Sequence, residues 1–498
     1  MRTAIRVPSE YRSLMSFLLG LTTERAAAII VFLLLFAMAA RVSVDPDMWW
    51  HLRLGEHIVE SGQPVYTDVF SHSQAGKSHR NHSWLSQVFM HGLWRLAGHL
   101  GLTVFVAALG SAGMVFLYRA GRGSIYMQGF VLIFGAACAA AFWSPRPQML
   151  TFFFGAVLIF LLFDLKRNGR DRLRALPLLL WFWGNCHGGY IMGFVLIGAF
   201  ALGEVTNSAF ALGDSPLPSR IIRKLIVMTL LSLALMPLNP LGLDIFVIPF
   251  DTIGISGLRQ YIQEWQSPDL SQPFTWGFVI LLLLLAGALM ASRRRLDATE
   301  CVLLGGSFCL ALLSGRNLPF FAIAAVPITT QLFDEALTRR GWSFPRRKRE
   351  QPHRVAINLI LIVLVAIGVL LHLTYVSDDD TVAAAVSQNW PVEAVRQLNA
   401  SALQGNLFNN YNWGGYLIFT ARQHPVFIDG RTDLHRETLA DYVSALGTKG
   451  WSDIFEKWDI SIALIDSSSY LAAQLEASSA WRREYTDEMA SIFVRSGL

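Results

Sequence analysis

Charged residues are scarce in this sequence. Asp, Glu, Lys and Arg make up 15% of the 498 residues and hydrophobic residues 53%, whereas soluble globular chains are about a quarter charged. This shortage of charge excludes an ordinary soluble protein. Long apolar runs recur along the chain instead, which predicts a mainly α, polytopic membrane protein.

Cysteine is scarce too, and no CxxC pair occurs. The four cysteines all lie in apolar stretches: Cys138, Cys186, Cys301 and Cys309. We expect buried free thiols rather than a disulfide framework or a zinc module. The sequence also lacks Walker A, GxSxG and HExxH motifs, and a GxGxxG between a strand and a helix, so it gives no support to the enzyme classes that they mark.

About eleven membrane spans are expected. They lie near residues 25–42, 101–118, 125–143, 149–165, 174–186, 188–205, 221–238, 275–292, 298–314, 317–334 and 355–376. The fifth and sixth spans are short, and helices of about 13 residues do not cross a bilayer of about 30 Å unaided. They need a thinned bilayer or a re-entrant arrangement, so the number is approximate.

The distribution of basic residues predicts the orientation. If the N-terminus is cytoplasmic, the inward-facing segments carry 24 of the 41 lysines and arginines, which is the positive-inside pattern. The basic pI therefore reflects topology, and nucleic acid is not an expected partner. The first span, preceded by Arg2, Arg6 and Arg12, could instead be a cleaved signal peptide. The run Arg346–Arg349 fits a topology anchor, or a contact with anionic lipid head groups.

Two large segments are expected on the outer side. Residues 43–100 form the first outer loop of a transmembrane domain spanning 1–376, and its stretches Trp49–Val59 and Trp84–Leu96 have the periodicity of interfacial helices. Residues 377–498 are predicted to form a small extracytoplasmic α/β domain. Its strands are expected near Leu407, Pro425–Asp429, Ser461–Asp466 and Ser491–Arg495, and its helices at Pro391–Leu403 and from Glu437 and Tyr470.

The polar motifs of the membrane half gather on the outer side. They include Asp45, Asp47, Arg146, His187, Glu264 and Arg316. A charge at the bilayer centre costs roughly 2.5–3.5 kcal/mol, so each residue alone fits the end of a helix. Together, carboxylates, arginines and a histidine on one face predict a polar cavity for a charged ligand.

The chemistry of these residues fits one reaction. A carboxylate such as Asp45 or Asp47 can accept a proton from a hydroxyl, and Arg146, Arg316 and His187 could hold a phosphate. A phosphate-linked leaving group and a hydroxyl nucleophile describe sugar transfer from a polyprenyl-phosphate carrier in the membrane.

Simpler interpretations stay open for several of these residues. Asp45 could be only a helix-end carboxylate, and His187 a packing histidine rather than a phosphate or metal contact. Trp49 and Trp50 could stack on a sugar or anchor the chain in the membrane interface. Asp45, Asp47 and a histidine could also take a divalent cation, although no ligand spacing is diagnostic and we assign no metal ligand.

Several motifs resemble a known family. DPDMWWHLRLGEHIVESGQPVYTDVFS, NHSWLSQ, SPRPQM, WFWGNCHGGY, EWQSP, SGRNLPFFAI, NNYNWGGYLIF and VFIDGRTD are similar to bacterial members of the GT-C superfamily of membrane glycosyltransferases. This superfamily includes protein O-mannosyltransferases, aminoarabinose transferases and oligosaccharyltransferases. The resemblance implies inverting transfer from a polyprenyl-phosphate-linked donor to a glycan, lipid or protein acceptor, at the outer face of a bacterial inner membrane.

The resemblance also implies site residues. The family's loop-one carboxylate, which acts as base or orients the acceptor, maps onto Asp45 or, slightly less well, Asp47. NNYNWGGY is similar to the WWDYG acceptor motif of oligosaccharyltransferases but lacks its Asp, which puts sequon recognition in doubt. The DGR segment Asp429–Arg431 either faces the cavity or forms a strand-end turn. The expected substrate contacts are Trp49, His51, His82, Arg146, His187, Glu264, Arg316, Asp429 and Arg431.

Two other functions fit parts of the pattern. A transporter or flippase of lipid-linked saccharides should show repeats and broken helices near the membrane midplane, whereas the polar motifs here lie on one face. A non-catalytic assembly or sensor protein should act through residues 377–498 alone.

Overall fold

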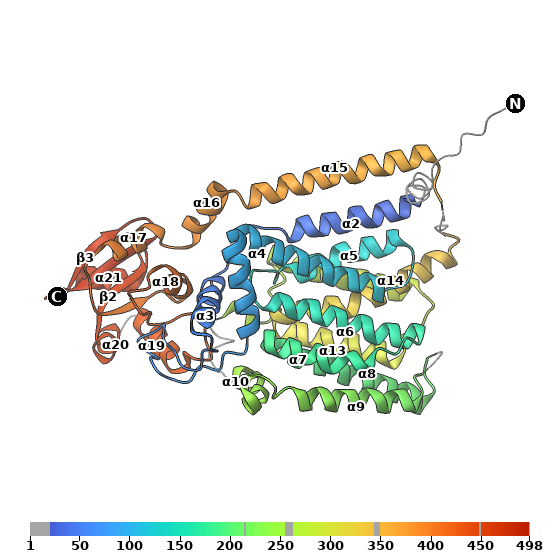
Figure 1. Ribbon diagram of the computed structural model, residues 1–498, viewed down its shortest axis with the longest axis horizontal. Helices are drawn as coiled ribbons and strands as arrows, with labels where there is room; N and C mark the ends of the chain where they lie inside the picture. The colour runs from blue at the N-terminus through green and yellow to red at the C-terminus, as the bar shows by residue number, and fades with distance from the viewer. Residues whose placement is uncertain (1–19, 214–215, 254–261, 343–348, 448–449, 498) are drawn as a thin grey trace.

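The helices form a bundle, and a small sheet with short helices covers one end of it (Figure 1). The computed structural model describes residues 20–213, 216–253, 262–342, 349–447 and 450–497. The basic N-terminal residues 1–19 and residues 346–348 of the predicted basic anchor lie outside the described residues.

Each of the eleven predicted spans falls on a helix. These helices are α2 (Thr23–Ala39), α4 (Trp84–Ala120), α5 (Ile125–Ala140), α6 (Gln148–Asn168), α7 (Leu176–Cys186), α8 (Ile191–Phe210), α9 (Ser219–Leu235), α12 (Trp276–Ala291), α13 (Ala298–Leu313), α14 (Leu318–Arg339) and α15 (Pro352–Val376). Six helical stretches, which include α4, α6, α8, α12, α14 and α15, are long and apolar enough to cross a membrane. The chain is therefore an integral membrane protein, whereas eleven crossings stay a prediction.

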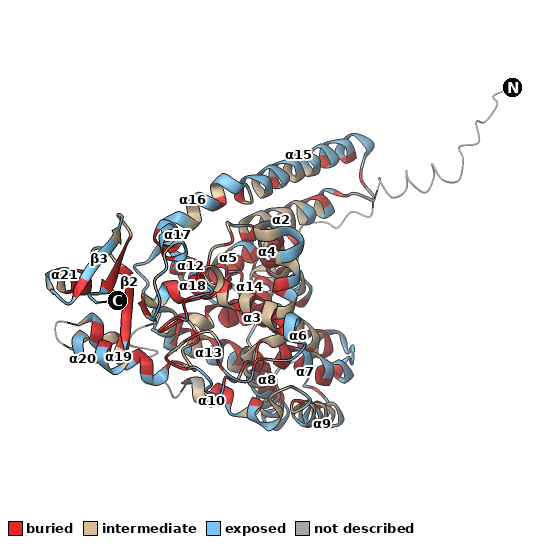
Figure 2. Ribbon diagram, turned by 60° about the vertical axis from the view of Figure 1, so that its left-hand side comes forward, coloured by how far each residue is buried: buried red, intermediate tan, exposed pale blue. Residues whose placement is uncertain are grey.

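The helices differ in how deeply they are enclosed. In the most apolar window of each helix, 72% of the residues are buried in α14 but only 17% in α15. α15 packs along α2 at the edge of the bundle (Figure 1), and most of its surface is exposed (Figure 2). Because the exposed side chains of α15 are mainly leucine, isoleucine and valine, we assign this surface to lipid.

Small residues let the central helices approach closely. A Cβ on Gly277 of α12 would lie 2.4 Å from the backbone carbonyl carbon of Ala137 in α5. A Cβ on Gly135 of α5 would lie 2.2 Å from Cγ2 of Val326 in α14. Such contacts are typical of membrane helices, whose association depends on close packing rather than on burial from water.

The first outer loop contains both predicted helical stretches. The first is α3 (Met48–Ser61). The second, Trp84–Leu96, is continuous with the following span in α4, and the chain kinks between them at Ala97 and Gly98. Gly98 has a φ of 54°, a left-handed conformation that glycine adopts without steric cost.

The C-terminal part contains a four-stranded sheet. Its elements are α16 (Asp379–Asn389), α17 (Val392–Ala400), β1 (Asn406–Asn409), α18 (Gly414–Thr420), α19 (Arg436–Leu446), α20 (Trp451–Lys457), β2 (Ile460–Asp466), α21 (Tyr470–Ala477), β3 (Trp481–Thr486) and β4 (Ala490–Arg495). The strand order is β1-β2-β4-β3, with β1 and β2 parallel and the other pairs antiparallel. We did not predict β3, because its mostly exposed, polar side chains lack the apolar alternation of a half-buried strand.

The strand predicted at Pro425–Asp429 is wrong. Among the described residues this segment pairs with a side chain and with the outer loop instead of with the sheet. The Asn409 side chain accepts a hydrogen bond from the backbone N–H of Phe427 at 2.8 Å, and Val426 forms an isolated bridge with Ser71. The segment thereby ties β1 to the first outer loop.

The hydrophobic core is continuous between the bundle and the sheet. One cluster of buried side chains extends from the bundle to Leu407 and Leu464 on one face of the sheet. A second cluster, which includes Phe408 and Phe427, fills the other face. The C-terminal part is therefore packed against the end of the bundle that carries the first outer loop.

Candidate active site

A cavity of about 1020 Å³ lies where the first outer loop, the C-terminal part and the adjacent ends of the bundle helices meet. Eight of the predicted site residues line it: Asp47, His51, His82, Arg146, His187, Glu264, Arg316 and Arg431. The inter-helix segments that were predicted to share one face therefore do share one site. Asp45, Trp49 and Asp429 are not among the lining residues.

Arg146 lies among three carboxylates. Its Nη2 is 3.1 Å from Oε1 of Glu264 and 3.4 Å from Oδ2 of Asp47, and its Nη1 is 3.7 Å from Oδ2 of Asp45. The second arginine, Arg316, reaches Glu264 at 3.9 Å. The three carboxylates thus face two guanidinium groups at the end of the bundle.

The Asp45-Pro46-Asp47 turn gives its two carboxylates different tasks. Oδ1 of Asp45 accepts a hydrogen bond from the backbone N–H of Asp47 at 2.8 Å, which closes the turn. Asp47 is the residue before α3, and its Oδ1 accepts from the indole N–H of Trp50 at 3.0 Å. Asp45 therefore supports the turn, and Asp47 faces the cavity.

Burial and neighbouring charges shift the pKa values of Asp47 and Glu264 in opposite directions. Burial raises the pKa of Asp47 to about 6, and Arg146 opposes that rise. Burial also favours the neutral form of Glu264, but Arg146 and Arg316 outweigh it and lower the pKa of Glu264 to about 2. At neutral pH Glu264 is a fixed anion, whereas Asp47 can gain or lose a proton.

Two glycines let the C-terminal part touch this turn. A Cβ on Gly430, in the DGR segment, would lie 1.9 Å from Oδ1 of Asp47. A Cβ on Gly415, in NNYNWGGY, would lie 2.4 Å from the carbonyl oxygen of Pro46. Both motifs therefore press their backbone against the turn that carries the candidate base.

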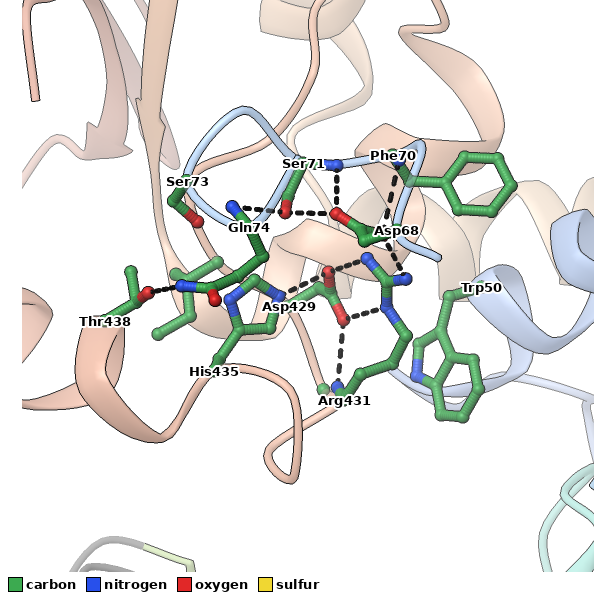
Figure 3. A network of polar contacts seen from close by, with 12 residues as sticks. Trp50, Asp68, Phe70, Ser71, Ser73, Gln74, Asp429, Arg431, His435 and Thr438 are labelled. Carbon is green, nitrogen blue, oxygen red and sulfur yellow. Dashed lines mark hydrogen bonds and ion pairs between the residues drawn. The ribbon is translucent and has the colours of Figure 1, made fainter. Parts of the chain in front are cut away.

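A buried ionic network holds the DGR segment to the first outer loop (Figure 3). The guanidinium of Arg431 contacts Oδ1 of Asp68 at 2.6 Å and donates to both oxygens of Asp429, at 2.8 and 2.7 Å. His435 Nε2 lies 2.9 Å from Asp429. Burial disfavours the Asp429 carboxylate, but Arg431 outweighs this and holds its pKa well below the usual range.

This network places the DGR segment beside the cavity and against the first outer loop. Arg431 lines the cavity, but its guanidinium is held by Asp68 and Asp429, which makes it a structural clamp rather than a ready phosphate contact. Sequence reasoning missed Asp68 and His435. Asp68 lies within the TDVFS stretch of the first outer loop, and nothing in its local sequence indicates a partner 363 residues away.

Trp49 is neither a membrane anchor nor a cavity residue. It is 4% exposed, and its ring packs against Trp390 at 5.7 Å and Tyr416 at 5.2 Å between ring centroids. These contacts fasten α3 to the C-terminal part. Trp50, the neighbour of Trp49, does line the cavity, as do Trp143 and Trp265.

His187 is a neutral hydrogen-bond donor that lines the cavity. Its Nδ1 accepts from the backbone N–H of Gly189 at 3.0 Å and pairs with the Thr151 hydroxyl at 2.8 Å. Since a backbone N–H only donates, the proton of the neutral ring lies on Nε2. Burial keeps the pKa of His187 well below its ordinary value. The ring of His82 lies 6.0 Å away.

The C-terminal part adds lining residues that the sequence did not single out. They are Tyr411, Asn412, Thr432 and Asp433. The Tyr411 hydroxyl pairs with the Thr432 hydroxyl at 2.9 Å. The sequence could have indicated all four residues, because they lie within the motifs NNYNWGGY and VFIDGRTD.

The carboxylates near Arg146 were also candidates for a divalent cation. The described residues contain no group of three or more His, Cys, Asp or Glu side chains arranged to hold a metal ion. Asp45, Asp47 and Glu264 offer the hard oxygen donors that Mg²⁺ or Ca²⁺ prefers, but all three face the guanidinium of Arg146. The residues present do not fit a resident cation.

The fold and the cavity define a helical membrane protein whose outer loop and C-terminal part enclose one polar site. No protein-family model matches the chain, and no curated protein matches it. Solved structures do match. The archaeal oligosaccharyltransferase AglB from Archaeoglobus fulgidus, in complex with an inhibitory peptide and a dolichol-phosphate, aligns with a TM-score of 0.57 and 12% identity. The alignment covers 98% of this chain and 75% of that chain.

A second structure matches over nearly its whole length. ArnT from Cupriavidus metallidurans, bound to undecaprenyl phosphate, aligns with a TM-score of 0.53 and 13% identity, over 98% of this chain and 99% of that chain. Identities this low establish the fold alone. The chain therefore shares its fold with these two structures, as the resemblance of its motifs implied.

Proposed function

We propose that the protein transfers a sugar from a polyprenyl-phosphate-linked donor to an acceptor hydroxyl at the outer face of a bacterial inner membrane. The observation that carries this proposal is the cavity that Asp47 and Glu264 line together with Arg146 and Arg316. The positive-inside pattern of the sequence supports an outward-facing position for this end of the bundle. Two structures with the same fold hold dolichol-phosphate or undecaprenyl phosphate, which supports a lipid-linked donor here.

Asp47 is the proposed general base. The acceptor oxygen attacks the anomeric carbon of the donor sugar, and its proton passes to the Asp47 carboxylate. The bond between that carbon and the phosphate oxygen breaks, and polyprenyl phosphate leaves with the electron pair. A single displacement of this kind inverts the anomeric centre. A base with a pKa of about 6 is well matched to this task near neutral pH.

Arg316 and His187 are the proposed contacts of the donor phosphate. The Arg316 guanidinium lies over the Trp265 ring at 4.6 Å and reaches Glu264 only at 3.9 Å. A guanidinium has five N–H donors in a planar fork that matches phosphate oxygens, so Arg316 can bind phosphate while keeping these contacts. The Nε2–H of His187 offers one more donor. Arg146, which we had also expected to bind phosphate, is held by carboxylates instead.

The C-terminal residues of the cavity are the proposed acceptor side. Residues 377–498 form, in this proposal, an extracytoplasmic unit that presents Tyr411, Asn412 and Asp433 to the acceptor. The site contains both hydroxyl and carboxylate groups there, which suits the polar surface of a glycan, a lipid head group or a protein side chain.

A transport assay separates this proposal from the flippase alternative. The purified protein is reconstituted in vesicles with a labelled polyprenyl-phosphate sugar and candidate acceptors. We expect transfer by the wild type and a transfer rate at least about 100-fold lower for Asp47→Asn. Movement of the intact lipid across the bilayer that survives Asp47→Asn, without any transfer by the wild type, would favour a flippase. No binding of the lipid at all would favour an assembly or sensor role.

A further inference from the structure

All three active-site carboxylates contact the guanidinium of Arg146. Nη2 of Arg146 lies between Glu264 at 3.1 Å and Asp47 at 3.4 Å, and Nη1 faces Asp45 at 3.7 Å. The Arg146 side chain is only 15% exposed. Three carboxylates so close together repel one another unless a positive charge lies between them.

A divalent cation would need the same place. Mg²⁺ and Ca²⁺ bind carboxylate oxygens at about 2.0–2.6 Å. An ion at that distance from the facing oxygens of Asp47 and Glu264 would lie against Nη2 of Arg146, and two positive charges would then share one small volume. The cluster can hold the guanidinium or the ion, but not both.

The chain mounts Arg146 rigidly. Arg146 stands between Pro145 and Pro147 in the turn that joins α5 to α6. A proline fixes its own φ and restricts the residue before it to extended conformations. The backbone N–H of Arg146 also donates to Ser144 at 2.7 Å. The SPRPQM motif therefore directs one permanently charged side chain into the carboxylate cluster.

We propose that Arg146 is the built-in counter-ion of this active site, holding Asp47 and Glu264 where a divalent cation would otherwise be needed. This inference rests on the proposed transfer reaction and adds the source of positive charge. Arg146 is then a positioning residue, because it acts on the acceptor through Asp47. Unlike a bound ion, its charge cannot dissociate or be removed by a chelator.

Binding of Mn²⁺, followed by electron paramagnetic resonance on the full-length protein in detergent, tests this without any substrate. We expect no binding by the wild type and binding by Arg146→Met, which keeps the length of the side chain but exposes the carboxylates. Adding Glu264→Gln to Arg146→Met should abolish that binding. Arg167→Met is a matched control, because Arg167 is buried against Glu300 at the other end of α6.

Two further measurements distinguish a positioning role of Arg146 from a purely structural one. Transfer by the wild type should be unchanged in EDTA. The groups that face Asp47 are Asp45, Arg146, Glu264, Arg316 and Tyr411. Without Arg146 the acidic limb of the pH profile should move up by about 1–3 units. Arg146→Lys keeps the charge and should restore most of the wild-type profile.

The outcomes are distinguishable from failure of the proposed function. Mn²⁺ binding by the wild type, or loss of its transfer in EDTA, overturns the inference, and so does a folded Arg146→Met that binds no Mn²⁺. If Arg146→Met does not fold, the two wild-type measurements decide alone. A wild type that binds no Mn²⁺ and transfers no sugar contradicts the proposed function but leaves the counter-ion in place.

Discussion

The backbone of Gly430 lies directly against the carboxylate of Asp47. A methyl group at Gly430 would be 1.9 Å from Oδ1 of Asp47 and 3.0 Å from Nε1 of Trp50. These two atoms form the hydrogen bond that orients the carboxylate. The C-terminal part of the chain therefore limits where the Asp47 carboxylate can lie, although Gly430 is more than 380 positions from Asp47 in the sequence.

Gly430→Ala should impair transfer without unfolding the protein. The added methyl must displace the Asp47 carboxylate, and a shift of about 1 Å at a reacting group can cost about 100-fold in rate. Single-turnover transfer with a labelled donor measures the effect. Gly92→Ala is the matched control, because a Cβ there meets no atom within 4 Å. Equal rates for the two variants would contradict the assigned contact.

The two aspartates of the turn should respond differently to amidation. Asp47→Asn removes the proton acceptor and should lower transfer by about 10²–10⁴-fold. Asp45→Asn keeps a side-chain oxygen that can accept from the backbone N–H of residue 47, so its loss should be much smaller. The rate of the chemical step, compared at saturating donor, makes the distinction. A larger loss for Asp45→Asn would return the base to Asp45.

The transfer rate should depend on the protonation of Asp47. Burial raises the pKa of this carboxyl to about 6, and only the carboxylate can accept a proton. The rate should therefore rise as the pH increases through about 6 and then level off. Asp47→Asn should show no such rise in its residual rate. A profile that is flat from pH 5 to pH 8 for the wild type would rule out this carboxyl as the base.

Protonation of Asp47 should also affect the stability of the protein. Stability should fall, rather than rise, as the pH increases through the pKa of this carboxyl. The folded-state pKa of Asp47 lies above the unfolded value of about 3.9. Its contribution to stability is thus fully present below the unfolded pKa and is lost as the pH rises through about 6. Asp47→Asn, which imitates the protonated form, should melt higher than the wild type at pH 7.5. The difference should shrink towards pH 4, as measured by intrinsic fluorescence.

The Arg431 clamp should carry much of the stability of the C-terminal part. Removing one member of a buried ion pair typically costs about 3–5 kcal/mol, and Arg431 serves two carboxylates, Asp68 and Asp429. Lysine cannot reproduce its forked geometry. Arg431→Lys should therefore speed hydrogen exchange in residues 401–447.

An exposed arginine of the C-terminal part provides the control for that experiment. Arg396 pairs with Glu393, and its side chain is 68% exposed. Exposed pairs contribute about 0–1 kcal/mol, so Arg396→Lys should leave hydrogen exchange unchanged. If Arg431→Lys exchanges as slowly as Arg396→Lys, the buried network is not the clamp.

Much of the fold could be predicted because membrane helices are recognisable in the sequence as long apolar runs. Runs such as 149–165 and 317–334 were recognisable from apolar length alone. The helix α6 contains the first run, and α14 contains all but the first residue of the second. Sheet pairing was harder. β3 was missed because its side chains are polar and exposed, and Pro425–Asp429 was misassigned because an Asn409 side chain supplies its partner.

Most of the charged residues and histidines that line the cavity could also be predicted from the sequence, but the contacts that each of them makes could not. Topology puts the segments that carry Arg146, Glu264 and Arg316 at one end of the bundle, so their proximity follows from orientation. Which partner each side chain takes depends on packing across the whole chain. Arg146 was expected to bind phosphate and faces carboxylates. Trp49 was expected to contact a sugar or to anchor the chain in the membrane interface, and it is enclosed by the C-terminal part.

The most direct test of the account follows the anomeric centre of the donor sugar. Purified wild-type protein in nanodiscs is given a polyprenyl-phosphate sugar labelled at the anomeric carbon, together with a hydroxyl acceptor, and the product is examined by nuclear magnetic resonance. We predict a glycoside of inverted configuration, free polyprenyl phosphate in equal amount, and formation of both products at least about 100-fold slower with Asp47→Asn. A product of retained configuration, or equal product from Asp47→Asn, would contradict direct displacement assisted by Asp47.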